Sequence, residues 1–263
     1  MIKRQNIYKE NNISTSSGGG VFFDGNVLGI SQSKFISNRS GYTGGAIMAS
    51  GNTNIHDSFF SLNTADLHGG AIKNVENLNI SKTEFVENYA KEWGGAIYQQ
   101  EEDASINLKD SSFEENSAID GGAIYNYAGS IRSLRSTFFI NSADLGGAIV
   151  NKQELIVTNS TFSANVAREK GGAIFNYGSS SATTLELSNT TIFQNTADQG
   201  GGIYSNNNTI VNLRNTILAS NEAVTSGNDC DTNAASFGPY NSFGYNLVGD
   251  TDDCQSSFLP TDN

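Results

Sequence analysis

Residues 85–97 read FVENYAKEWGGAI, and the recurrence of this pattern along the chain predicts the fold. It contains two motifs: an apolar residue three positions before an asparagine, and a Gly-Gly-Ala-Ile block that starts six positions after that asparagine. The block, or a close variant of it, recurs along the chain at intervals of 25 to 29 residues. The blocks begin at Gly18, Gly44, Gly69, Gly94, Gly121, Gly146, Gly171 and Gly200. Self-similarity at a fixed period of this length is the sequence signature of a solenoid.

The second motif keeps phase with the first. Each asparagine precedes the next glycine pair by five or six residues. The pairs are Phe35/Asn38, Phe60/Asn63, Phe85/Asn88, Phe113/Asn116, Phe138/Asn141, Phe162/Asn165, Ile192/Asn195 and, after the last block, Leu218/Asn221. Because both motifs stay in register over so many periods, each period is interpreted as one coil.

A third strand signal lies between the motifs, where apolar and polar residues alternate, as in Leu78-Asn79-Ile80 and Leu185-Glu186-Leu187. Period-2 alternation over short runs is typical of half-buried strands, and no segment shows a sustained helical period. The sequence therefore predicts an all-β fold, a single-stranded right-handed parallel β-helix of about eight to nine coils with three short strands per coil. We expect a lead-in or cap at 1–17, the repeats at 18–221, and an irregular, truncated tail at 222–263 that continues or caps the helix.

Stacked coils lie about 4.8 Å apart, so equivalent side chains form columns along the rod. The isoleucines of the glycine blocks are expected to form one interior column, and the phenylalanines a second with stacked rings. The asparagines are expected to form a structural ladder at an inward turn, each side-chain amide bonding to those above and below. Its members are Asn38, Asn63, Asn88, Asn116, Asn141, Asn165, Asn195 and Asn221. The glycine pairs mark a corner that needs positive φ or close backbone approach.

Composition narrows the function classes. Among 263 residues, 15 are Lys or Arg and 27 are Asp or Glu, a net charge of −12 that argues against nucleic-acid binding. No run approaches the ~20 apolar residues of a transmembrane helix, and no secretory signal follows the initial methionine. We therefore expect the chain to be a fragment of a longer protein, with any membrane association made through a segment missing from it.

The paired Gly-Gly-Ala-Ile and Phe-x-x-Asn motifs resemble the passenger repeats of chlamydial polymorphic outer-membrane proteins, over about residues 18–221. The C-terminal stretch is similar to the choice-of-anchor Q region of bacterial surface proteins, on residues 215–221, 229–230, 243–250 and Cys254. The resemblance implies a secreted or surface-exposed passenger, extracellular or on the outer membrane, with a structural and adhesive role. A host-cell or matrix protein, or a glycan, is the partner that such a role implies.

Many β-helix proteins are polysaccharide lyases or hydrolases, and such an enzyme is the alternative function. Lyase chemistry needs grouped acidic calcium ligands and a base, and hydrolysis needs paired carboxylates. The outer positions just after the glycine corner carry instead Phe22, Met48, Lys73, Tyr98, Tyr125, Val150, Phe175 and Tyr204. The stripe of Tyr98, Tyr125, Phe175 and Tyr204 is a candidate ligand contact, or else a stacked surface ladder that stabilises the rod. No catalytic constellation and no cofactor site is predicted.

Metal sites are also not predicted. Turn aspartates recur at Asp66, Asp120, Asp144 and Asp198 but not on every coil, as a calcium ladder would require. The only histidines, His56 and His68, lack partners at a metal-ligand spacing, and we expect His68 and Trp93 to lie on the surface. Near the cysteines, an acidic group leaves open a calcium site or a solvated loop. Its members are Asp229, Asp231, Asp250, Asp252 and Asp253.

Cys230 and Cys254 are 24 residues apart, which is nearly one coil. Adjacent layers would place their Cα atoms near 4.8 Å, within the range of about 4.4–6.8 Å that a disulfide allows. The spacing predicts a disulfide and an oxidising compartment, and the alternative is two buried free thiols in a cytosolic protein.

Overall fold

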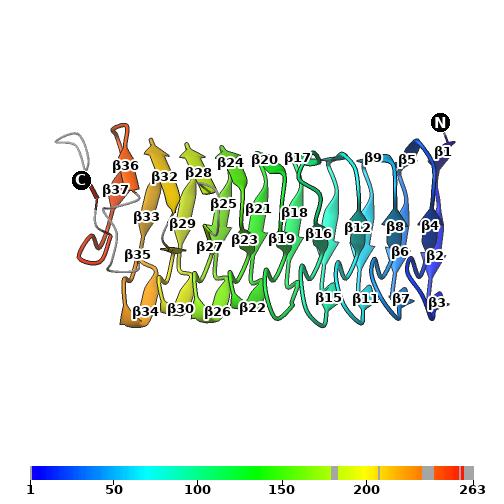
Figure 1. Cartoon of the computed structure of the whole chain (residues 1–263), viewed down its shortest axis with the longest axis horizontal. Helices are drawn as coiled ribbons and strands as arrows, with labels where there is room; N and C mark the ends of the chain where they lie inside the picture. Colours follow the sequence, from blue (N-terminus) through cyan, green and yellow to red (C-terminus); the bar gives the residue numbers. More distant parts are fainter. Residues whose placement is uncertain (1, 179–182, 207, 233–239, 255, 258–263) are drawn as a thin grey trace.

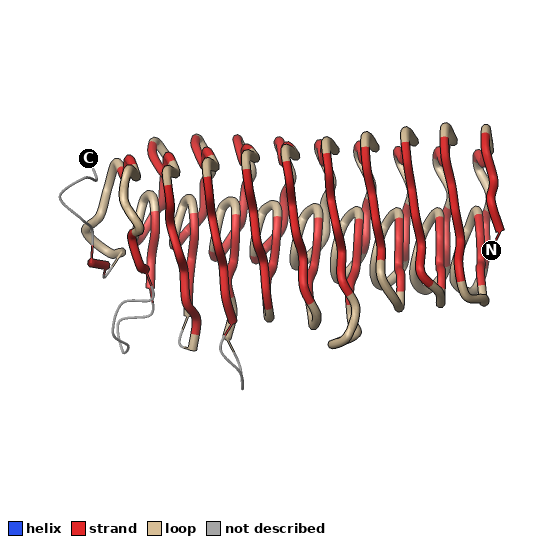
Figure 2. The backbone as a smooth tube through the Cα atoms, turned by 90° about the horizontal axis from the view of Figure 1, so that it is seen from above, coloured by secondary structure: helices blue, strands red, loops and turns tan. Residues whose placement is uncertain are grey.

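The computed structural model describes residues 2–178, 183–206, 208–232, 240–254 and 256–257. These residues contain strands and no helix, and they wind into a rod with the two ends of the chain at opposite ends (Figures 1 and 2). The rod is a parallel β-solenoid of about nine turns, which confirms the predicted fold class. Within the described residues there is consequently no helix that could span a membrane.

Two long sheets form two sides of the rod, and every strand in them pairs in parallel with its counterpart in the next coil. Sheet A consists of β1 (Ile2–Gln5), β5 (Val27–Ser31), β9 (Asn52–His56), β13 (Leu78–Ser81), β17 (Ser105–Lys109), β20 (Ser130–Leu134), β24 (Glu154–Thr158), β28 (Thr183–Ser188), β32 (Thr209–Arg214), β36 (Tyr240–Ser242) and β38 (Ser256–Ser257). Sheet B consists of β2 (Tyr8–Glu10), β6 (Lys34–Ile36), β10 (Phe59–Ser61), β14 (Glu84–Val86), β18 (Ser112–Glu114), β21 (Thr137–Phe139), β25 (Thr161–Ser163), β29 (Thr191–Phe193), β33 (Ile217–Ala219) and β37 (Leu247–Val248).

The glycine blocks lead into the third long sheet. Sheet D consists of β4 (Val21–Phe23), β8 (Ile47–Ala49), β12 (Ile72–Asn74), β16 (Ile97–Gln99), β19 (Ile124–Asn126), β23 (Ile149–Asn151), β27 (Ile174–Asn176), β31 (Ile203–Ser205) and β35 (Cys230–Thr232).

A fourth, short strand lies between sheets B and D in most coils, where three strands per coil were predicted. These strands form the two halves of sheet C: β3 (Ile13–Ser14), β7 (Arg39–Ser40), β11 (Thr64–Ala65) and β15 (Tyr89–Ala90), then β22 (Ser142–Leu145), β26 (Val166–Lys170), β30 (Thr196–Gln199) and β34 (Glu222–Ser226). The ladder asparagine turns the chain into this strand, so the segment between the motifs is paired and not a loop.

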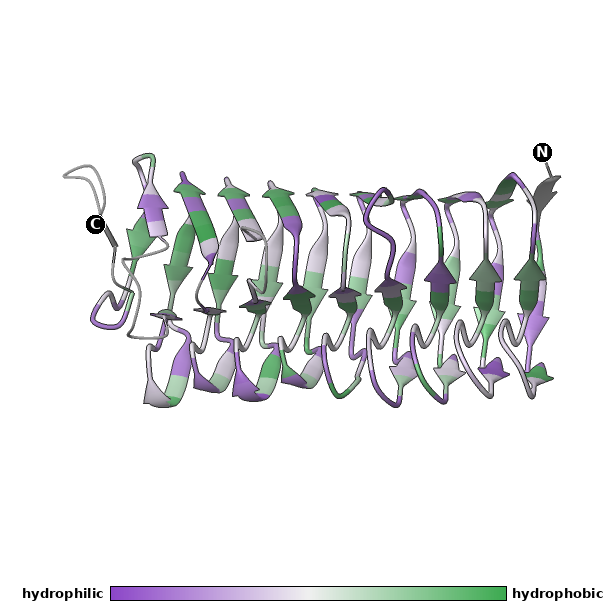
Figure 3. Cartoon of the chain, viewed as in Figure 1, coloured by the Kyte–Doolittle hydropathy of each residue, from purple (hydrophilic) through white to green (hydrophobic). Residues whose placement is uncertain are grey.

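The core consists of columns of similar residues, because the register pairs equivalent positions of successive coils, and the phenylalanine and isoleucine columns are the most regular. Phe60 pairs with Phe35 on one side and Phe85 on the other. Ring centroids of successive phenylalanines lie 4.5–5.0 Å apart with nearly parallel planes. All six rings, Phe35 to Phe162, are fully buried, as are the isoleucines of sheet D. Apolar segments accordingly recur at the same place in coil after coil (Figure 3).

The glycine corner has no room for side chains. Gly94 has φ +66°, and a Cβ there would run into the carbonyl oxygen of Ile97. A Cβ on Gly95 would run into the carbonyl oxygen of Gly122 in the next coil. Both the backbone conformation and the 4.8 Å layer spacing therefore require the pair.

The asparagines bond along the rod as well as to the backbone. Asn116 accepts hydrogen bonds from the backbone N–H and the Nδ2 of Asn88, at 3.0 and 2.9 Å. Its own Nδ2 donates to Oδ1 of Asn141 and to the carbonyl oxygen of Phe85. The same pattern repeats along the series and includes Asn12, which the motif search did not find. Asn12 belongs to residues 2–14, whose three strands pair with β5, β6 and β7 as a first coil.

A second polar ladder, of hydroxyls, lies at the corner between sheets A and B. Oγ of Ser58 accepts the backbone N–H of Ser33, and Oγ of Ser136 accepts that of Ser111. Each hydroxyl stands two residues before the apolar column of sheet B, from Ser33 before Phe35 onward. That fixed offset is a signal in the sequence that would have predicted this ladder.

Candidate functional site

The aromatic stripe lies on the outer side of sheet D, with its back to the isoleucine column. Tyr98 pairs with Tyr125, Val150 stands between Tyr125 and Phe175, and Phe175 pairs with Tyr204. We expected these rings to be exposed, but only 3–7% of each residue is accessible. They form a second apolar cluster outside the main core.

The segment that leads from sheet C into the glycine corner covers the stripe. Trp93 from this segment stacks on Tyr125, with centroids 5.2 Å apart, and His68 stacks on Trp93 at 4.4 Å. Leu145 and Tyr177 pack against the same cluster. His68 and Trp93 are therefore half-buried and not on the surface as predicted, because their rings continue the stack.

Three lysines contact the rings of this face. Lys73 Nζ lies 4.3 Å from the centroid of Tyr98, and Lys170 Nζ lies 4.4 Å from that of Tyr204. Lys152 Nζ lies over Tyr127 and Tyr177, at 4.6 and 5.2 Å. An ammonium is attracted to the negative face of an aromatic ring, so the lysines hold the cluster together at its rim. Burial lowers the pKa of Lys73 to about 8 and raises that of Tyr98 to about 12.

A cavity of about 170 Å³ opens in this face at the one coil where the stripe lacks a ring. Val150 and Leu145 contribute aliphatic side chains to its lining, together with three aromatic residues. Its lining is Asp120, Tyr125, Leu145, Val150, Lys152, Phe175 and Tyr177. Burial, and then the charges of Asp144 and Glu169, raise the pKa of Asp120 to about 6.

Asp120 should make the rod less stable as the pH rises. Its folded-state pKa, about 6, is above the unfolded value of about 3.9, so the folded state binds the proton more tightly. The stabilisation is complete below pH ~4 and is lost as the pH rises through 6. We expect Asp120→Asn to raise the Tm at pH 7.5 by roughly 2 °C, since solvent screens this partly open carboxyl. Thermal unfolding followed by circular dichroism should show the difference vanish near pH 4, and an equal difference at both pH values would contradict this assignment.

Two of the other turn aspartates pair with arginines of neighbouring coils. Asp66 pairs with Arg39 at 2.9 Å, and Asp144 pairs with Arg168 at 2.9 Å. Nowhere in the described part of the chain do three His, Cys, Asp or Glu side chains come together so that they could hold a metal ion.

A shallow groove of about 720 Å³ runs along the outer side of sheet A, over β5 to β20. Asn79 donates to Oδ1 of Asn54 and accepts from Nδ2 of Asn107, both at 3.0 Å, so an exposed amide row lies along it. This row was not predicted, although the asparagines are the polar members of the alternating strands.

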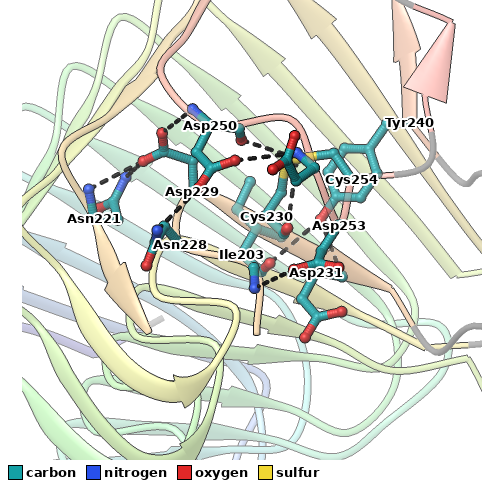
Figure 4. The surroundings of a disulfide bond; sticks show 12 residues. Ile203, Asn221, Asn228, Asp229, Cys230, Asp231, Tyr240, Asp250, Asp253 and Cys254 are labelled. Carbon is teal, nitrogen blue, oxygen red and sulfur yellow. Dashed lines mark hydrogen bonds between the residues drawn. A yellow bond between two sulfur atoms is a disulfide. The ribbon is translucent and has the colours of Figure 1, made fainter. Parts of the chain in front are cut away.

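The C-terminal end of the rod is closed by a cap around the predicted disulfide (Figure 4). Cys230 pairs with Ile203 and so extends the isoleucine column, and it is bonded to Cys254 with a Cα–Cα distance of 5.1 Å. This confirms the disulfide. Gly227, with φ +67°, opens a further corner of the glycine-block type, Gly227-Asn228-Asp229-Cys230. This corner was not predicted, because three of its four residues differ from the Gly-Gly-Ala-Ile block.

Asp229 stands in the alanine position of that corner and ends the asparagine ladder. Its Oδ1 accepts the backbone N–H and the Nδ2 of Asn221, as the next asparagine would. Its Oδ2 accepts the backbone N–H of Asp250 at 2.7 Å. Asp253 accepts the backbone N–H of Gly227. Asp229 is thus the acceptor at the end of the ladder, and it is buried, so this member of the acidic group does not lie in a solvated loop.

Removing the disulfide should loosen the cap but not the rod. Closing a loop of this length stabilises by about 3 kcal/mol in the chain-entropy model. We expect the double variant Cys230→Ser/Cys254→Ser to lose hydrogen-exchange protection in β31, β33 and β35, while β12 and β16 keep theirs because coils contact only their neighbours. Unchanged protection at the C-terminal end would show that the cap does not depend on the disulfide. Thiol titration of the denatured, unreduced wild type should find no free thiol.

These features define a class of protein: a β-helical rod built from repeats. Its core is filled by side chains, its C-terminal end is capped, and its chemically varied side chains lie on the outer sides of the sheets. Four segments, residues 82–100, 110–127, 159–177 and 189–206, match the Chlamydia polymorphic membrane protein (Chlamydia_PMP) repeat. Each runs from the apolar column of sheet B to the isoleucine column of sheet D, so the chain carries these repeats, as its two motifs predicted. No curated protein and no solved structure gives a significant match.

The polymorphic membrane proteins are a non-enzymatic outer-membrane and surface family, so the repeats indicate a surface passenger. The similarity of the C-terminal stretch to the choice-of-anchor Q region stays a prediction, as do the domain bounds at residues 17 and 221.

Proposed function

We propose that the chain is an adhesive passenger, displayed at the cell surface, whose rod presents binding faces to a host-cell or matrix protein or to a glycan. The observation that carries the proposal is the outer side of sheet D, where aromatic rings, Lys152 and Asp120 line an open cavity. Two further lysines, Lys73 and Lys170, lie over rings of the same face. Aromatic side chains with a few convergent polar groups are typical of ligand sites.

Two further features support display outside the cell. The disulfide suits an oxidising compartment, because cytosolic thiols are kept reduced. The ladders and stacked rings hold the coils in a continuous rod, and rods built from repeats offer extended binding surfaces.

Adhesion can be tested with beads coated with the purified chain. We expect the beads to bind cultured epithelial cells, or surfaces coated with matrix proteins, several-fold more than albumin-coated beads, and soluble chain to compete. Binding equal to that of albumin on all of these surfaces would contradict the adhesive role.

A further inference from the structure

The cavity in the outer side of sheet D is a gap in an otherwise continuous aromatic column. Tyr125 and Phe175 are two coils apart in the same column, with Val150 between them. Two layers of about 4.8 Å separate them, so a ring inserted over Val150 would lie about 4.8 Å from each. Ring centroids of aromatic pairs lie about 4.5–7 Å apart, and the neighbouring pairs of this column lie 5.7 and 6.0 Å apart. The space between Tyr125 and Phe175 therefore admits one more ring.

The size of the cavity sets the size of its ligand. At about 170 Å³ it is smaller than the ~300–1,000 Å³ of pockets that hold drug-sized molecules. It therefore takes one ring and not an extended chain.

The polar groups of the cavity set the chemistry of that ring. Asp120 and Lys152 both line it, and they interact through space. Among the described side chains, neither Asp120 nor Lys152 forms an ion pair, and Lys152 Nζ lies over the rings of Tyr127 and Tyr177. A purely apolar ring would displace water from the Asp120 carboxylate and the Lys152 ammonium without replacing its hydrogen bonds, and this desolvation costs free energy.

We infer that the gap over Val150 is a subsite for a single pyranose ring of a glycan. A pyranose has C–H faces that pack on Tyr125 and Phe175, and hydroxyl groups at its edge. Those hydroxyls donate to the carboxylate of Asp120 and accept from the ammonium of Lys152. The inference rests on the proposed adhesive function, which it deepens by naming the site and the class of ligand.

The test fills the gap with a side chain that the neighbouring coils already carry. Because Phe175 occupies the equivalent position one coil away, Val150→Phe should fold, with a Tm at or above that of the wild type. Saturation-transfer NMR would be run with a panel of methyl glycosides of common pyranoses, including an N-acetylated sugar and a uronate. We expect at least one to receive saturation from the wild type and from the matched control Val150→Ala, and to bind Val150→Phe about tenfold more weakly or not at all.

A second variant tests the polar partner without filling the gap. Asp120→Asn keeps the shape but removes the charge, and it should weaken the same sugar by several-fold. The inference is overturned if no methyl glycoside binds the wild type, or if binding is undiminished in Val150→Phe. Binding of N-acetyltyrosine amide without any sugar would also overturn it, and would assign the gap to an aromatic side chain of a partner protein.

The bead assay separates this inference from the proposed function. Adhesive wild-type beads with no sugar binding would reject the subsite and leave adhesion standing. Sugar binding by a chain whose beads do not adhere would reject adhesion and leave the subsite standing.

Discussion

Replacing Phe138 with aspartate is expected to break the rod in its middle. Phe138 is fully buried, and its ring stacks on Phe113 at 4.9 Å and on Phe162 at 4.5 Å. An unpaired carboxylate in this column is far more costly than the loss of the ring, and the total should exceed about 5 kcal/mol. Because coils are stabilised by their neighbours, the loss should spread to adjacent coils. Hydrogen exchange should show lost protection in β18, β21 and β25, with residual protection in β6 and β10.

The adjacent residue provides the control. Phe139 is on the same strand but points outward, and 37% of it is exposed. Phe139→Asp places the new charge beside Glu114 of the preceding coil, which should cost about 1 kcal/mol or less. Similar losses of stability from the two substitutions would mean that the inward column of sheet B does not hold the rod together.

The columns could be predicted from the sequence because residues one repeat period apart become neighbours when the coils stack. Once Phe85 and Phe113 occupy equivalent positions, the layer spacing alone places them in contact. The disulfide followed in the same way, since its spacing is close to one period.

The corner between sheet B and sheet C could not be predicted from residue types. The residue before each ladder asparagine has a left-handed backbone, as with Glu87 at φ 53° and Ile140 at φ 54°. These residues share no chemistry, and isoleucine disfavours this conformation. Hydrogen bonds of the neighbouring asparagine hold the turn, so the fourth strand, in the coils that have it, depends on contacts between coils and not on local preference.

Burial of the aromatic stripe was missed for a related reason. Alternation along sheet D shows correctly that Tyr125 points away from the core. Whether that side meets water depends on Trp93, which arrives from the previous coil and stacks on Tyr125. The repeat period does not predict which side chains cover the outer side of the sheet, because the residue before the glycine block differs from coil to coil, as Trp93 and Leu145 show.

Replacing Asn116 with leucine is expected to cost roughly 3–6 kcal/mol, although the side chain keeps nearly the same shape. The loss follows from the hydrogen bonds: the backbone N–H and Nδ2 of Asn88 lose their shared acceptor, and the carbonyl oxygen of Phe85 loses a donor. All of these groups are buried, and each unsatisfied group costs about 1–3 kcal/mol. Urea unfolding measures the total loss of unfolding free energy. The hydrogen-exchange rate of the backbone N–H of Asn88 reports the loss of its hydrogen bond to Asn116 directly.

Asn79→Leu is the matched control for this ladder. Asn79 bonds to the asparagines above and below it with the same amide-to-amide distance of 3.0 Å, but it lies on the exposed side of sheet A. Water replaces its partners when the side chain is removed, so the expected cost is at most about 1 kcal/mol. If the two substitutions cost the same, burial would not be the source of the ladder's strength. If only Asn116→Leu is costly, the recurrence of asparagine at this position follows from unsatisfied groups inside the rod, because no other side chain both accepts from the coil before and donates to the coil after with this reach.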